Sequence, residues 1–132
     1  MPRQASRMKI HLMNDKQIEV SEFHEDSFDI SLDNEALYFG AMPMFVASLA
    51  RCTFAVLENY AMRLDVESDL ITMRLNWDYA SQPTRISEIE MRIYWAELPA
   101  SRLKAVQRAA HLCTIHNTIS RCVQVETRVE IG

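Results

Sequence analysis

Glycine is scarce in this chain of 132 residues, where the two glycines are Gly40 and Gly132. A dinucleotide-binding fingerprint and a phosphate-cradling loop each need several clustered glycines, so both motifs are excluded. Positive charge is also in short supply, because 14 basic residues stand against 18 acidic ones and the net charge is −4. The sequence therefore lacks the basic footprint of a protein that binds a nucleic-acid backbone, and we expect no nucleic-acid partner.

The chain has three cysteines, a small and odd number. An odd number of cysteines fits a protein of the reducing cytoplasm better than a scaffold held together by disulfides. The stretch Met1 to Lys9 contains charges but no apolar core of the length that a secretory signal needs. From residue 36 to 57 the single formal charge is Arg51, and this length would span a membrane. Gly40 and Pro43 interrupt the stretch, so we interpret it as the buried helix of a cytoplasmic protein without a membrane partner.

The length matches one domain of roughly 100–150 residues, and we predict a single domain over residues 1–132. Residues 1–42 form a short β-rich part, in which apolar residues alternate weakly and predict three short strands between positions 8 and 32. Residues 43–132 form a helix-β-β-helix-β part. Its first helix is predicted from Pro43, a residue that suits the first helical position, to about Leu64.

The clearest β pattern lies at residues 71–79 and 89–95, where apolar side chains occupy every second position. The turn residues 81–84 between them predict an antiparallel pair. A second helix is predicted from Ala100 to about Leu112, and a last strand from 123 to 131. This order describes an α+β fold. A chain of 15.3 kDa has little volume in which to hide the long apolar helix, which indicates a dimer.

Two cysteines are candidates for chemistry. Cys52 lies in the middle of the apolar helix, where most cysteines are inert packing residues and where activation needs a cationic neighbour. Arg51 is adjacent, but neighbouring side chains on a helix point about 100° apart. Cys113 lies where the second helix ends, and a following helical turn is expected to aim backbone amides at its sulfur.

The residues around Cys113 leave a metal alternative open. His111, Cys113, His116 and Cys122 have the ligand types of a zinc site, although their spacing matches none of the common paired motifs. We expect no metal here, and we interpret Cys122 as a packing residue. A redox sensor that uses Cys113 and His116 without Cys52 is a further alternative.

A two-part pattern links this sequence to a known family. Residues 47–53 read Ala-Ser-Leu-Ala-Arg-Cys-Thr, and residues 110–119 read Ala-His-Leu-Cys-Thr-Ile-His-Asn-Thr-Ile. With their cysteines 61 positions apart and a Val-rich ending, these segments resemble the OsmC/Ohr family of organic hydroperoxide reductases. The resemblance covers roughly residues 43–131.

The resemblance implies an intertwined homodimer, in which two antiparallel β-sheet parts wrap around long central helices. It also implies a thiol peroxidase, with Cys52 as the peroxidatic residue and Cys113 as the resolving residue. Cys113 would trap an oxidised Cys52 as a disulfide, which requires Cα atoms within about 7 Å. A lipoyl-type dithiol would then reduce the pair, and no cofactor is expected.

The sequence also departs from the family pattern. The resemblance implies a glutamate about ten residues before Cys52 and an arginine from the amino-terminal sheet. The window 41–45 holds no acid, and Arg3 and Arg7 are the arginines of the amino-terminal region. The alternative function is therefore a non-catalytic dimeric module of the same fold that binds a small apolar ligand. Eight methionines, whose side chains adapt to apolar surfaces, suit that alternative.

Overall fold

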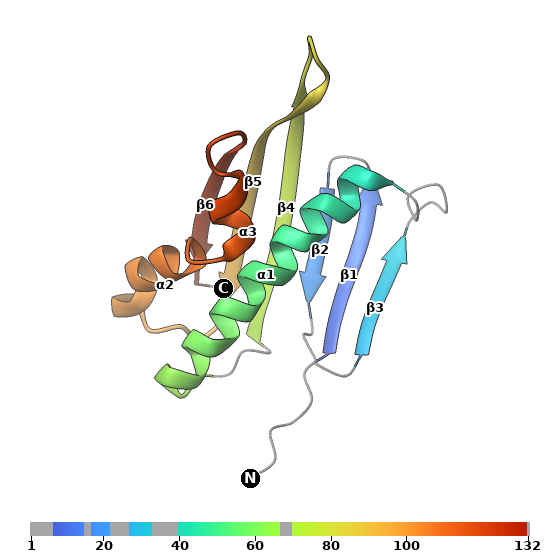
Figure 1. The fold of residues 1–132 in the computed structure, drawn as a ribbon. Helices are drawn as coiled ribbons and strands as arrows, with labels where there is room; N and C mark the ends of the chain where they lie inside the picture. The colour runs from blue at the N-terminus through green and yellow to red at the C-terminus, as the bar shows by residue number, and fades with distance from the viewer. Residues whose placement is uncertain (1–6, 15–16, 22–26, 33–39, 67–69, 132) are drawn as a thin grey trace.

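The computed structural model describes residues 7–14, 17–21, 27–32, 40–66 and 70–131. The fold is α+β, as the sequence predicts, and its elements follow in the expected order (Figure 1). They are β1 (Arg7–Asn14), β2 (Gln17–Ser21), β3 (Ser27–Leu32), α1 (Ala41–Leu64), β4 (Ile71–Ala80), β5 (Arg85–Trp95), the 3-10 helix η3 (Ala100–Arg102), α2 (Leu103–Ala110), α3 (Thr114–Ile119) and β6 (Gln124–Glu130).

The described strands form one six-stranded sheet in the order β3-β1-β2-β4-β5-β6. The two expected sheet parts are joined by antiparallel pairing between β2 and β4, in which Ile18 lies opposite Leu75. The β1–β3 and β5–β6 pairs are parallel, a point on which the structure departs from wholly antiparallel parts. The three α-helices cover one face of this sheet, so one face holds the core (Figure 1).

The β4–β5 hairpin confirms the alternation that the sequence shows. Met73 faces Ile93, and Trp77 faces Ile89 across the antiparallel pair. Buried and exposed positions alternate along β4 until a register shift after Asp78. Because each apolar side chain on this face meets another across the strands, the hairpin forms the floor of the core.

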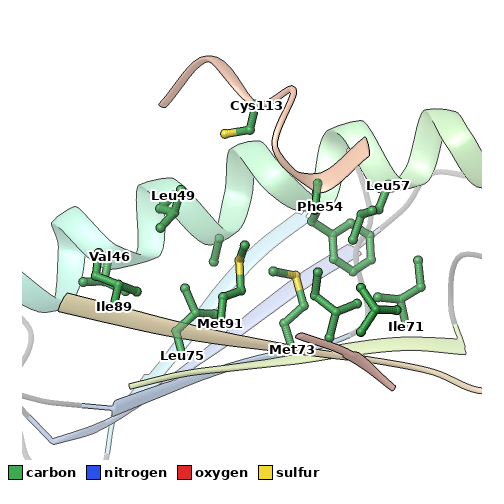
Figure 2. Packing of buried hydrophobic residues seen from close by; sticks show 14 of the residues in the cluster. Val46, Leu49, Phe54, Leu57, Ile71, Met73, Leu75, Ile89, Met91 and Cys113 are labelled. Atoms are coloured by element: carbon green, nitrogen blue, oxygen red, sulfur yellow. The ribbon is translucent and has the colours of Figure 1, made fainter. Parts of the chain in front are cut away.

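Helix α1 begins at Ala41, two residues before the predicted start at Pro43, and ends at Leu64. Its C-cap residue, Asp65, has a left-handed backbone (φ 56°). Ten of its 24 residues are buried. Leu49, Phe54 and other apolar side chains reach from α1 toward the methionines of β4 and β5 (Figure 2). Among the described residues, α1 is the one helix long and apolar enough to cross a membrane, and packing on the sheet accounts for that apolar character.

The predicted second helix is interrupted. Its first turn is the 3-10 helix η3, α2 ends at Ala110, and α3 begins four residues later at Thr114. The amide of Gln107 donates to the carbonyl of Thr127 on β6 at 3.1 Å, which ties α2 to the sheet edge. The break places Cys113 in an extended backbone conformation between two helices, where its side chain can turn back toward α1.

Candidate redox site

The structure brings Cys52 and Cys113 together, although 61 residues separate them in the sequence. Helix α1 packs against α2 and α3, and this contact places the Cys52 side chain against the Cys113 thiol. Both cysteines are free, and they differ in exposure because Cys52 is half-buried and Cys113 is fully buried. The pair thus joins one partly exposed cysteine to one that is fully buried.

Cys113 occupies the N-cap of α3, as its position after the second helix predicts. Its sulfur accepts a hydrogen bond from the backbone N–H of His116 at 3.4 Å. Burial raises the pKa of the Cys113 thiol, and so does the neighbouring Cys52 thiol, while the His116 amide lowers it. The net pKa is raised, so at neutral pH the resting Cys113 is a protonated thiol.

Thr53 is a third member of the site. It ends the first segment of the two-part pattern but was not predicted as a site residue. Its hydroxyl faces the Cys113 thiol and lowers the pKa of that thiol. The same hydroxyl is buried without a hydrogen bond of normal geometry within the described part of the chain. Thr53 directly follows Cys52 on α1, so the signal available in the sequence was its position beside the first cysteine.

Two histidines lie beside the pair. The rings of His111 and His116 stack with centroids 4.5 Å apart and an interplanar angle of 11°. Burial lowers the pKa of His116, and the neighbouring His111 lowers it further, so this ring is neutral at pH 7. Its Nδ1 has no hydrogen-bond partner among the described residues.

The zinc alternative finds no support in the structure. No group of three or more His, Cys, Asp or Glu side chains is arranged as metal ligands within the residues described. Cys122 is exposed, so the interpretation of Cys122 as a packing residue was wrong. It lies between the end of α3 and β6, in a turn that points its side chain to solvent.

The structure leaves the arginine partner of the family pattern unassigned. Arg51 is exposed while the adjacent Cys52 is half-buried, as the 100° rotation between neighbours on a helix requires. Arg3 and the side chain of Arg7 lie outside the described part of the chain. The described start of α1 carries no acidic residue in its first turn.

Comparison of the sequence with models of known protein families finds a match to one family. The family model described as OsmC-like protein matches residues 32–128, a range that contains both cysteines of the pair. No protein of curated function matches the sequence.

Solved structures of low sequence identity share the fold over the whole chain. A protein from Psychrobacter arcticus 273-4, described as a putative osmotic stress induced and detoxification response protein, is 17% identical with a TM-score of 0.64, covering 100% of this chain and 98% of that one. An OsmC like protein from Mycoplasma pneumoniae is 18% identical with a TM-score of 0.61 at the same coverage. An organic hydroperoxide resistance protein OsmC from Legionella pneumophila is 16% identical with a TM-score of 0.59, covering 99% of this chain and 100% of that one.

Proposed function

This chain belongs to the OsmC-like family, and from that premise we propose that it is a thiol peroxidase that reduces organic hydroperoxides. Cys52 is the peroxidatic residue, and Cys113 is the resolving residue. The observation that carries the proposal is the contact between these two free thiols, which lie 61 residues apart in sequence. The difference in their exposure supports this assignment of roles, because Cys52 is partly exposed whereas Cys113 is fully buried.

The oxidative half of the reaction follows from these positions. The Cys52 thiolate attacks the distal oxygen of the hydroperoxide, the O–O bond breaks, and the alkoxide leaves as the alcohol after taking a proton. Cys52 is then a sulfenic acid. The Cys113 sulfur, deprotonated at that moment, attacks the Cys52 sulfur and displaces hydroxide, which leaves as water. The product is a Cys52–Cys113 disulfide.

The reductive half uses the same asymmetry. A thiolate of an external dithiol attacks the accessible Cys52 sulfur and displaces Cys113. The amide N–H of His116 and the hydroxyl of Thr53 both favour the charged form of Cys113, so they stabilise the sulfur that leaves. The second thiol of the reductant then closes its own disulfide and releases Cys52. Two electrons pass from the dithiol to the protein.

A homodimer is part of the same proposal. In the single chain, α1 leaves Met42, Met44 and Met62 exposed, with exposed fractions of 39%, 40% and 59%. Met44 and Met62 are 18 residues apart, which is five turns of an α-helix, so they lie on one side of α1 that a second copy of the chain would cover. Sedimentation equilibrium is expected to give twice the chain mass of 15.3 kDa, and a single-chain mass would contradict the dimer.

A turnover assay tests the peroxidase directly. The purified protein is expected to consume cumene hydroperoxide catalytically when dithiothreitol is present, and to stop after one equivalent when it is absent. Hydrogen peroxide, which lacks an apolar group, is the comparison substrate and is expected to react more slowly. Consumption that is no faster than in a mixture without protein would contradict the proposal.

A further inference from the structure

The resolving step of the proposed reaction moves a proton. Resting Cys113 is a protonated thiol, so the attack of its sulfur on the Cys52 sulfenic acid releases a proton. The hydroxide that leaves Cys52 takes up a proton to become water. Because Cys113 is fully buried, bulk water does not contact its thiol to carry that proton away. A group inside the site therefore has to pass the proton from Cys113 to the leaving hydroxide.

The surroundings of the Cys113 thiol narrow the choice of that group. In the part of the chain that the structure describes, the thiol is influenced by the Cys52 thiol, the backbone amide of His116 and the Thr53 hydroxyl. The Cys52 thiol is the reaction partner, and the His116 amide is a donor that accepts no proton. A hydroxyl has one donor hydrogen and two acceptor lone pairs, so the Thr53 side chain can both take and give a proton.

The Thr53 hydroxyl differs from other helical hydroxyls of this chain. Ser48, on the same helix, donates to the backbone carbonyl of Phe45 at 2.6 Å. Thr118 on α3 likewise donates to a carbonyl of its own helix, at 2.8 Å. Thr53 is fully buried and makes no such bond among the described residues. Its hydroxyl is therefore not held by its own helix and is available to the Cys113 thiol that it faces.

The N-cap hydrogen bond orients the Cys113 sulfur. This sulfur accepts from the backbone N–H of His116 on its α3 side, so its own S–H hydrogen is directed away from that donor. Cys113 lies on the segment that crosses over α1 (Figure 2), and α1 carries both Cys52 and Thr53. On that side the Thr53 oxygen is the acceptor available to the S–H group.

We propose that Thr53 is a catalytic residue that relays the proton of the resolving step. The inference rests on the proposed function and adds a residue to it. The Cys113 S–H gives its proton to Thr53 Oγ1, and the Thr53 O–H gives its own proton to the sulfenic oxygen on Cys52. The Cys113 sulfur supplies the electron pair of the new S–S bond, the S–O bond breaks, and the oxygen leaves as water. Thr53 ends with one hydroxyl hydrogen, as it began.

Thr53→Val and Thr53→Ser are a matched pair of variants, because valine keeps the shape of threonine without the hydroxyl and serine keeps the hydroxyl. A single turnover with cumene hydroperoxide is stopped with acid and read by intact mass, in which the sulfenic acid adds one oxygen and the disulfide removes two hydrogens. Thr53→Val is expected to close the disulfide about a hundredfold more slowly than wild type at pH 7. Thr53→Ser is expected to recover most of the rate.

The pH profile of disulfide closure separates a relay from a structural role. Without the relay the Cys113 thiol has to ionise before it attacks, and its pKa is raised. Closure in Thr53→Val is therefore expected to accelerate about tenfold per pH unit from about pH 7 to pH 9. In wild type the proton moves internally, so the rate is expected to change by less than about threefold over that range. The neighbouring His111 and His116 are the same in both proteins, and the lowered pKa of His116 keeps its ring neutral throughout.

Thr127→Val is the control for the loss of a buried hydroxyl. Thr127 on β6 is buried, its hydroxyl also lacks a partner among the described residues, and it is not one of the groups that act on Cys113. This variant is expected to close its disulfide at the wild-type rate. Both valine variants are expected to unfold at a urea concentration at least as high as wild type, because each removes a buried hydroxyl that makes no hydrogen bond of normal geometry.

The outcomes distinguish the relay from the peroxidase. A Thr53→Val protein that closes its disulfide as fast as wild type overturns the relay and leaves the peroxidase standing. The same holds for a Thr53→Val protein that is slower by one constant factor at every pH, and for equal slowing by Thr127→Val. A Cys113→Ser protein in which cumene hydroperoxide produces no sulfenic acid at Cys52 contradicts the peroxidase and the relay together.

Discussion

Replacing Cys52 with serine is expected to lower hydroperoxide turnover by at least about a thousandfold, because the hydroxyl oxygen cannot accept the peroxide oxygen as sulfur does. The proposed peroxidatic Cys52 is half-buried and contacts the buried Cys113, and serine, which has the same shape and is slightly smaller, fits the site without a clash. Cys113→Ser is expected to behave differently. Cys52 still reacts once with the hydroperoxide, and the protein then stops as a sulfenic acid that dimedone traps.

Cys122→Ser is the matched control for both variants. Its thiol is exposed and lies outside the pair, so full turnover is expected. Steady-state rates with cumene hydroperoxide and dithiothreitol measure all three proteins under the same conditions. A Cys52→Ser protein with more than about a tenth of the wild-type rate would show that another group carries the chemistry.

Leu57→Ala is expected to lower the free energy of unfolding by about 2–5 kcal/mol. Leu57 is fully buried on the face of α1 that packs on the sheet, next to Phe54 and across from the strands (Figure 2). Its removal leaves a cavity between helix and sheet. The neighbouring side chains fill such a cavity only in part, because α1 is held along its length by its other buried residues.

Leu112→Ala removes the same atoms from a side chain that is 71% exposed, and is expected to change the unfolding free energy by less than about 0.5 kcal/mol. Urea denaturation at one fixed protein concentration measures both variants. Equal effects of the two substitutions would contradict the placement of α1 with its Leu57 face on the sheet.

Local patterns predicted the elements of this fold, and their assembly needed the structure. Alternation of apolar and polar residues sufficed to place β4 and β5, because successive side chains of a strand point alternately into the core and toward solvent. The alternation does not show which strands pair or in which direction, so it did not predict the parallel pairing of β5 with β6 and of β1 with β3. These contacts join strands that are not consecutive in the chain, because β2 lies between β1 and β3, and helices lie between β5 and β6. A short turn in the sequence signals only the antiparallel pairing of consecutive strands.

For the second helix, the local sequence pattern predicted a helical end that lies beyond the observed one. Apolar spacing continues from α2 past Ala110, so the sequence predicted a helix to about Leu112. The structure ends α2 at Ala110, leaves Leu112 exposed and buries Cys113 against α1. There Cys113 contacts Cys52, a residue far away in sequence, and a contact of that kind leaves no signal in the local spacing.

The candidate pair could be named from the sequence because two cysteines stand in segments that resemble one family. The residues that surround the pair could not be predicted from the sequence. The position of Thr53 beside Cys113 arises from the packing of α1 on α3, and the stack of His111 on His116 arises from the break between α2 and α3. Spacing along one helix reveals neither. Cys122 shows the opposite error, since a cysteine beside an apolar strand was predicted to be buried and is exposed.

The central claim is that Cys52 and Cys113 form one redox pair, and counting thiols tests it most directly. The protein is treated with one equivalent of cumene hydroperoxide, alkylated without reduction, and weighed as an intact chain by mass spectrometry. Loss of two of the three alkylatable thiols is expected, and Cys52→Ser and Cys113→Ser should each abolish this paired loss while Cys122→Ser retains it. Three thiols that all remain alkylatable would contradict the redox pair and favour a module that keeps the fold to bind an apolar ligand.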